Sequence, residues 1–344
     1  MIKEILQEAF ILKSKGYYKH SIEAFYKALE LDNKSSELLL EIADCYYLMH
    51  DEERALNYIE QVLEFDSTHI DSLKLLKRIF IDKEAWNEAT KTSENIYMIS
   101  KEPRDLVEIL RLLNLQQKYS EVLEYDAQFE NADIFYEKAY ACLFCNEIAL
   151  AEKNIDLALS YNLQDSKKLL LKGKIFFKQG REEDCVEILN QMQLDFSDHD
   201  MLNFAGLIEQ QQGNYKKALE YFTKAINLNS KMAEYYYNCA STYFKIGDIA
   251  FAKKYYNLAI SINPDNPNYH LALANLYYSE KQYRRALEEL DYDFYEANLL
   301  KALILYESGY IALAKKGLDM LKAERPNDFV VDEYLTKIRE KLEI

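Results

Sequence analysis

The chain has 344 residues, with 42 basic and 58 acidic side chains and a formal net charge of −16 at pH 7. This excess of acid disfavours binding to a phosphate backbone, which requires clustered Lys and Arg, so no nucleic-acid partner is expected. No run of about 18 apolar residues is present, so no membrane span is expected. Residues 1–10 already belong to a predicted helix. We therefore expect no signal peptide, and the cytoplasm is the predicted location.

Ten compact side chains recur along the chain at nearly constant spacing. The successive gaps are 34, 34, 33, 29, 34, 33, 34, 34 and 28 residues. A period near 34 residues is typical of helix–turn–helix repeat arrays, in which each repeat packs only against its neighbours. The ten positions are Ser21, Ala55, Ala89, Val122, Ala151, Cys185, Ala218, Ala252, Ala286 and Ala314.

The spacing predicts a single continuous stack over 1–344. Only 8 Gly and 4 Pro are present, which leaves little room for linkers. Five of the glycines fall at the expected turn between paired helices, where a positive φ favours Gly: Gly16, Gly180, Gly213, Gly247 and Gly309. The expected repeats are 2–35, 36–69, 70–102, 103–131, 132–165, 166–198, 199–232, 233–266, 267–294 and 295–328, followed by a cap over 329–344.

Individual copies share more than the compact residue. The first copy contains GYYKHSIEAFYKALELDN from Gly16, and the seventh contains GNYKKALEYFTKAINLNS from Gly213. Both segments resemble the second half of a tetratricopeptide repeat, and Ala240 with Tyr243 matches the first half. The resemblance covers nearly the whole chain. It implies an all-α, right-handed α-solenoid of about ten repeats, a fold with many unrelated protein partners.

The first helix of most copies carries a small residue where helix axes are expected to cross closely. The eight positions are Ala9, Ala43, Ala139, Gly173, Gly206, Ala240, Ala274 and Ala302. The gaps of 29 and 28 residues predict that the second helices of the fourth and ninth copies are shorter by about one turn. After Pro326, a final helix is expected to pack through Val330, Tyr334, Ile338 and Leu342 and to close the stack with a polar outer side.

No catalytic or metal motif is recognisable. Phosphate-binding glycine loops, nucleophile elbows and zincin motifs are absent, so we expect no enzyme activity, no cofactor and no metal. Cys142 and Cys145 form one C-x-x-C pair without a second pair or a nearby His, which is a weak zinc or redox signal. Packing in the core is the favoured interpretation of these cysteines, and of Cys185 and Cys239.

The resemblance also implies where a partner would bind. In this family the inner groove is lined by the first helices, at about positions 2, 5, 9, 12 and 13 of each repeat. Here those positions carry a basic and aromatic strip. The alternative interpretation is that these cations pair with neighbouring acids. The predicted groove residues are Lys74, Arg78, Arg104, Arg111, Tyr136, Tyr140, Phe144, Lys167, Lys174, Phe177, Lys178, Tyr237 and Asn275, with Asn203, Phe244, Tyr278 and Tyr306.

The sequence therefore predicts a non-catalytic scaffold or adaptor that holds a protein segment or helix in its concave groove. The expected partner is acidic, with apolar or aromatic anchors. The alternative is a self-associating regulatory or assembly subunit of a larger complex. Bare first-repeat surface near Ile2, Ile5 and Leu6 would favour that alternative.

Overall fold

The computed structural model describes residues 2–32, 35–125, 129–192 and 194–342, and every regular element in these ranges is a helix, with no strand. The chain forms two compact units, Met1–Gln179 and Gly180–Ile344. Their boundary falls inside the predicted sixth repeat, and a single continuous stack over the whole chain stays a prediction. None of the described helices is both long enough and apolar enough to cross a bilayer.

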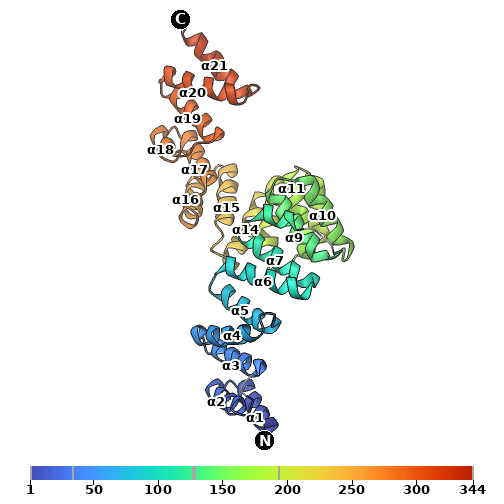
Figure 1. Cartoon of the computed structure of the whole chain (residues 1–344). Helices are drawn as coiled ribbons and strands as arrows, with labels where there is room; N and C mark the ends of the chain where they lie inside the picture. The colour runs from blue at the N-terminus through green and yellow to red at the C-terminus, as the bar shows by residue number, and fades with distance from the viewer. Residues whose placement is uncertain (1, 33–34, 126–128, 193, 343–344) are drawn as a thin grey trace. The chain divides into compact units, whose positions relative to one another are not determined.

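Helices α1 to α11 belong to the first unit and α12 to α21 to the second (Figure 1). The first unit contains α1 (Ile2–Ser14), α2 (Tyr18–Leu29), α3 (Ser36–Leu48), α4 (Glu52–Phe65), α5 (Ile70–Asp82), α6 (Trp86–Ser100), α7 (Pro103–Leu115), α8 (Tyr119–Glu124), α9 (Ala132–Phe144), α10 (Ile148–Ser160) and α11 (Ser166–Lys178). The second contains α12 (Glu182–Gln191), α13 (His199–Gln211), α14 (Tyr215–Leu228), α15 (Ala233–Ile246), α16 (Ile249–Ile262), α17 (Pro267–Ser279), α18 (Tyr283–Glu288), α19 (Tyr295–Glu307), α20 (Ile311–Glu324) and α21 (Phe329–Leu342).

The compact residues hold the repeats together as predicted. All ten positions of the ladder, from Ser21 to Ala314, have 0% of their surface exposed. The small residues of the first helices are buried too, and Gly206 lies directly against the ring of Phe222. Because these side chains are compact, neighbouring helices can approach closely and bury the larger apolar residues between them.

The turn between paired helices has the same backbone conformation in every copy. The five predicted glycines have φ between +72° and +88°. The other five copies place a different residue at the same turn, still with positive φ: His50, Glu84, Gln117, Asn146 and Lys281. A left-handed residue ends the first helix and turns the chain into the second, so repeat geometry imposes this conformation even where the side chain opposes it.

The second helices of the fourth and ninth copies are shorter than predicted. Helices α8 and α18 have 6 residues each, whereas α4 and α14 have 14 residues each. The loss is therefore about two turns rather than one. In the ninth copy the chain continues from α18 into non-helical residues 290–294 before α19 begins, so the connection takes up residues that a full-length repeat would keep helical.

The C-terminal helix packs through a different face from the one predicted. Val331, Leu335 and Ile338 of α21 are buried, whereas Val330 is 37% exposed. Ile338 was predicted correctly and Tyr334 is half-buried, but the side chain of Leu342 lies outside the described residues. Val330 and Val331 are chemically equivalent, and only the packing of α21 against α20 decides which one turns inward.

The N-terminal apolar residues and the cysteines are buried or half-buried. Ile2, Ile5 and Leu6 are half-buried against the N-terminal core rather than bare. Cys142 is buried as predicted, as are Cys185 and Cys239. Cys145 is the exception, because it caps the end of α9 and is only partly buried.

Candidate functional site

First helices of successive repeats contact one another in both units, as α3 does with α5 and α15 with α17. The contact between α7 and α9 is the most extensive of these, and the six-residue α8 lies between the two helices in sequence.

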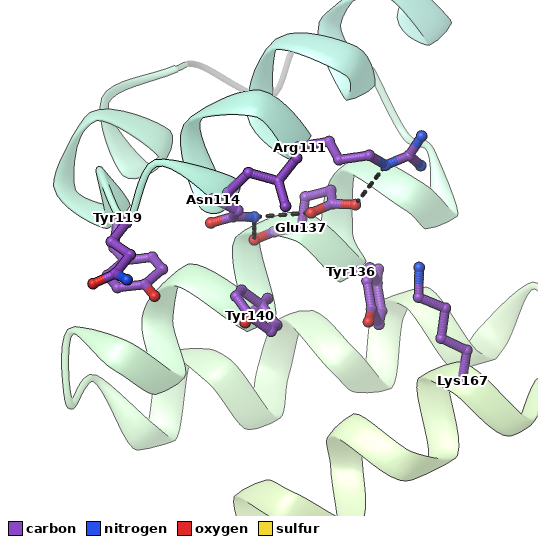
Figure 2. A pocket seen from close by; sticks show the side chains of 9 residues that line it. Arg111, Asn114, Tyr119, Tyr136, Glu137, Tyr140 and Lys167 are labelled. Carbon is purple, nitrogen blue, oxygen red and sulfur yellow. Dashed lines mark hydrogen bonds and ion pairs between the residues drawn. The ribbon is translucent and has the colours of Figure 1, made fainter. Parts of the chain in front are cut away.

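A cavity of about 390 Å³ lies beside this contact. Its volume falls within the range of ligand pockets, roughly 300–1,000 Å³. Helices α7, α9 and α11 contribute most of the side chains, and Figure 2 shows them arranged around the opening. The lining residues are Arg111, Asn114, Leu115, Gln117, Tyr119, Tyr136, Glu137, Tyr140 and Lys167.

Local sequence fixes where the three helices begin. Pro103 occupies the first turn of α7, where its missing N–H costs nothing. Asn131 accepts hydrogen bonds from Asp133 N and Ile134 N, at 2.8 and 3.2 Å, and so caps α9. Asp165 caps α11 in the same way through Lys167 N at 3.1 Å.

A buried acid lies at the centre of the cavity wall. Glu137 is only 5% exposed, and its Oε2 accepts a 2.8 Å hydrogen bond from Asn114 Nδ2. Arg111 Nε lies 3.4 Å from Glu137 Oε1, and Arg111 Nη1 lies 3.6 Å from Glu108 Oε2. Arg111 is therefore largely neutralised by its neighbours, as the alternative interpretation of the groove cations anticipated.

Aromatic rings cover one end of the cavity. The ring of Tyr119 stacks on Phe144 at 4.8 Å between centroids and lies 6.3 Å from Tyr140. Phe144 is 52% exposed and Leu115 is 63% exposed, so apolar surface faces solvent here. Burial raises the pKa of the Tyr119 phenol above its ordinary value.

A lysine lies at the other end. Lys167 Nζ is 4.8 Å from the ring centroid of Tyr136, a cation–π contact, and it forms no ion pair among the described residues. The adjacent Lys168 differs, because it is 2.7 Å from Asp165 and 3.2 Å from Asp133. Figure 2 shows the Lys167 ammonium directed toward the cavity beside Tyr136.

Four predicted groove residues thus share one cavity: Arg111, Tyr136, Tyr140 and Lys167. The structure does not bring Lys74 and Arg78 to it. They line a separate cavity of about 250 Å³ with acidic neighbours, where Lys74 lies 3.2 Å from Asp71. Arg78 Nε donates to the Tyr47 hydroxyl at 2.9 Å.

The other predicted residues of the first unit are not among those that line the 390 Å³ cavity. Arg104 is exposed near the start of α7. On α11, Lys174 and Phe177 are half-buried. Lys178 Nζ donates to the Leu143 carbonyl at 2.8 Å, where it complements the negative end of α9.

Several predicted residues of the second unit are taken up by its core. Tyr306 is 8% exposed and Asn203 is 4% exposed. Tyr237 packs between two rings, 5.7 Å from Tyr256 and 5.2 Å from Tyr269, and burial raises its pKa. Tyr306 and Asn203 are therefore buried rather than open, and Tyr237 is half-buried. Two others, Phe244 and Asn275, are exposed, and Tyr278 lies half-buried against Tyr283.

Sequence reasoning missed Asn114, Glu137 and Tyr119. Asn114 occupies the same groove register as Arg111, one turn later, and could have been found from it. Glu137 lies next to Tyr136, outside the expected register, and has no sequence signal. Among the described residues, no three His, Cys, Asp or Glu side chains gather as a metal site requires.

Comparison with known proteins places this geometry in a family. Models described as "Tetratricopeptide repeat" match residues 209–276 and 6–35. A TPR repeat-containing protein of Methanocaldococcus jannaschii is 25% identical over 319 residues, which cover 83% of this chain and 54% of that protein. The BBSome complex member BBS4 of Bos taurus is 25% identical over 309 residues, which cover 87% of this chain and 58% of BBS4. The chain thus spans a little more than half the length of these relatives.

A solved structure extends the likeness in fold. The crystal structure of the APC/C hetero-tetramer Cut9-Hcn1 matches with a TM-score of 0.63 at 14% identity, over 98% of this chain and 76% of that one. The matching models agree with three features of the chain. These are the period of the compact residues, the conformation of the turns and the pairing of the helices. The chain belongs to the tetratricopeptide repeat family.

Proposed function

We propose that this chain is a non-catalytic interaction scaffold that holds a segment of a partner protein against the first helices of its first unit. The observation that carries the proposal is the cavity beside α7 and α9, where four residues predicted from the family register come together. Helical repeat proteins present such first-helix surfaces to their partners. By their printed names, BBS4 and Cut9 are members of multi-protein complexes, which supports the same class of role here.

The proposed partner segment is acidic and carries an apolar anchor. Arg104 and Lys167 are cations of this face that form no ion pair among the described residues, whereas Lys74 and Arg111 already contact carboxylates. The unpaired cations are available to an acidic ligand in a molecule whose net charge is −16. Tyr140 and its neighbouring rings offer the apolar contact that usually contributes most to interface energy. We also retain the cytoplasm as the proposed location.

Charge reversal tests this proposal. Partners captured from the source cell with the wild-type chain would be identified by mass spectrometry, and the affinity of each purified partner would then be measured. Arg104→Glu with Lys167→Glu should weaken binding at least tenfold, and binding to the wild type should weaken as salt rises.

The matched control is Lys91→Glu with Lys153→Glu. Both lysines are exposed on second helices, α6 and α10, and form no ion pair among the described residues. The control therefore changes the net charge by the same amount on a different face. Equal loss of affinity in both double variants would reduce the effect to net charge, and unchanged affinity in the groove variant would refute the proposed face.

A further inference from the structure

One glycine of the chain lies neither at a turn nor at a predicted helix crossing. Gly317 is inside α20, whereas five of the other glycines have positive φ at turns, and Gly173 and Gly206 lie at crossings of first helices. Glycine destabilises a helix interior relative to alanine. The nearest atom to an ideal Cβ at residue 317 is Ala302 Cβ, at 3.4 Å, which is an ordinary contact. Close packing therefore does not require glycine at this position.

In two other copies, a tyrosine occupies the position of Gly317, three residues after the compact ladder residue. Tyr58 of α4 stacks on Tyr46 of α3, with 5.7 Å between ring centroids and 8° between ring planes. Tyr255 of α16 stacks on Tyr243 of α15 at 5.4 Å. In both copies, the second helix thus places an aromatic ring against the first helix of the same copy.

The tenth copy has a cavity where these copies have a ring. Leu305 of α19 replaces the first-helix tyrosine, and Gly317 replaces the second-helix one. Both residues line a cavity of about 360 Å³, together with Ala302, Met320 and Leu321. An apolar cavity of roughly 150 Å³ can hold a benzene molecule, so this one has room for an aromatic ring. Met320 is 67% exposed, so apolar surface faces solvent beside it.

The rest of the lining is polar and mainly acidic. Asp293 and Glu324 are exposed and form no ion pair among the described residues. Asp293 Oδ1 accepts a hydrogen bond from Asn298 Nδ2 at 2.8 Å, and Lys301 Nζ donates to the Tyr292 carbonyl at 3.0 Å. The two carboxylates outnumber the one lysine. Charge complementarity therefore favours an occupant that carries a positive charge beside its apolar part.

We propose that this cavity receives an aromatic side chain from a segment of a partner protein, and that a Lys or Arg stands beside that side chain in the segment. The ring would pack on Leu305 and Gly317, in the place that a tyrosine takes in the second and eighth copies. The cation would lie near Asp293 and Glu324. An aromatic residue that fills a fitted pocket often contributes much of the binding energy of an interface.

This inference goes beyond the proposed function. The cavity belongs to the second unit, and the first and second helices of a single copy form it, rather than the first helices of successive copies. Its occupant is basic, whereas the segment proposed for the first unit is acidic. The chain would then bind two segments of opposite charge at two separate sites.

The probe is the peptide Gly-Ser-Phe-Lys-Ser-Gly, acetylated and amidated, with para-fluorophenylalanine as its aromatic residue. Fluorine NMR follows its binding to the full chain, and unlabelled peptides compete with it. Replacing Phe by Ala should weaken competition roughly tenfold or more, and replacing Lys by Glu should weaken it roughly threefold. These comparisons use only the wild-type protein. Equal competition by the three peptides would overturn the inference.

Variants of the chain locate the site. Gly317→Tyr should fill the cavity with the chain's own ring and weaken peptide binding roughly tenfold or more, with an unchanged helical circular dichroism signal. The matched control is Ala312→Tyr, which adds the same ring at an exposed position of α20 outside the cavity and should bind like the wild type. Asp293→Asn with Glu324→Gln should remove the preference for Lys over Glu in the peptide. Unchanged affinity in Gly317→Tyr, or equal loss in both tyrosine variants, would overturn the inference.

Two other occupants are outcomes that would also overturn it. If toluene, the bare ring, competes as strongly as the peptide, the cavity takes a small aromatic molecule. If the wild-type chain dimerises in sedimentation experiments and Gly317→Tyr is monomeric, a second copy of the chain fills the cavity. Neither outcome bears on the proposed function, because Arg104 and Lys167 belong to the first unit.

Discussion

Gly206 offers a direct test of how the repeats pack. It lies in α13, where an ideal Cβ would be 2.5 Å from Phe222 Cε1 and 2.7 Å from Phe222 Cδ1. Phe222 is fully buried, so its ring cannot move into solvent to make room. Gly206→Ala should therefore overpack the interface at a cost of about 1–3 kcal/mol, opposed by a gain in helix propensity of about 1 kcal/mol.

Gly317→Ala in α20 is the matched control. The nearest atom to a Cβ at that position is Ala302 Cβ at 3.4 Å, which is an ordinary contact. It should gain the same propensity without overpacking, so the two alanine variants should differ by about 1–3 kcal/mol. Urea denaturation followed by circular dichroism gives the difference, provided that the m-values agree. Equal stabilisation of both variants would refute the packing described for Gly206, and Phe222→Leu should partly restore the stability of Gly206→Ala.

Two further predictions concern the turns and the thiols. Gly247 has φ +88° and open space around it, so Gly247→Ala should lower the free energy of unfolding by about 1 kcal/mol or more through backbone strain alone. Glu84→Gly at the equivalent turn should leave the free energy of unfolding unchanged or raise it by up to about 1 kcal/mol. Thermal melting compares them, and a stabilised Gly247→Ala would contradict the turn conformation. Cys145 should react first with a thiol reagent at pH 8, because burial raises the pKa of the other four thiols, to about 11 for Cys142. Rapid reaction of two or more thiols in the native protein would contradict the burial described.

Much of the fold could be predicted because each repeat contacts mainly its neighbours, so a local pattern repeated along the chain contains the tertiary arrangement. The compact ladder and the glycine turns are of this kind, and even Glu84 and Lys281 adopt the turn that the period requires. The register of α21 could not be predicted. Val330 and Val331 have equal hydrophobicity, and the packing of one helix against another decides between them.

The site was predicted only in part. The family register identified Arg111, Tyr136, Tyr140 and Lys167, which share a cavity. It did not identify the burial of Glu137 or its pairing with Arg111, because these depend on how closely α7 and α9 approach. The gap of 29 residues predicts the shortened repeat. It does not predict how the side chains of α7 and α9 pack against each other.

The central claim is that the first helices around α7 and α9 receive a partner protein, and site-specific photo-crosslinking tests it most directly. A photo-reactive benzoylphenylalanine would replace Tyr140 in the cavity or, as a control, Leu157, which is 38% exposed on the second helix α10. We expect the cavity position to form a covalent adduct with the captured partner and the control position to form none. An adduct from position 157 with none from position 140 would contradict the account.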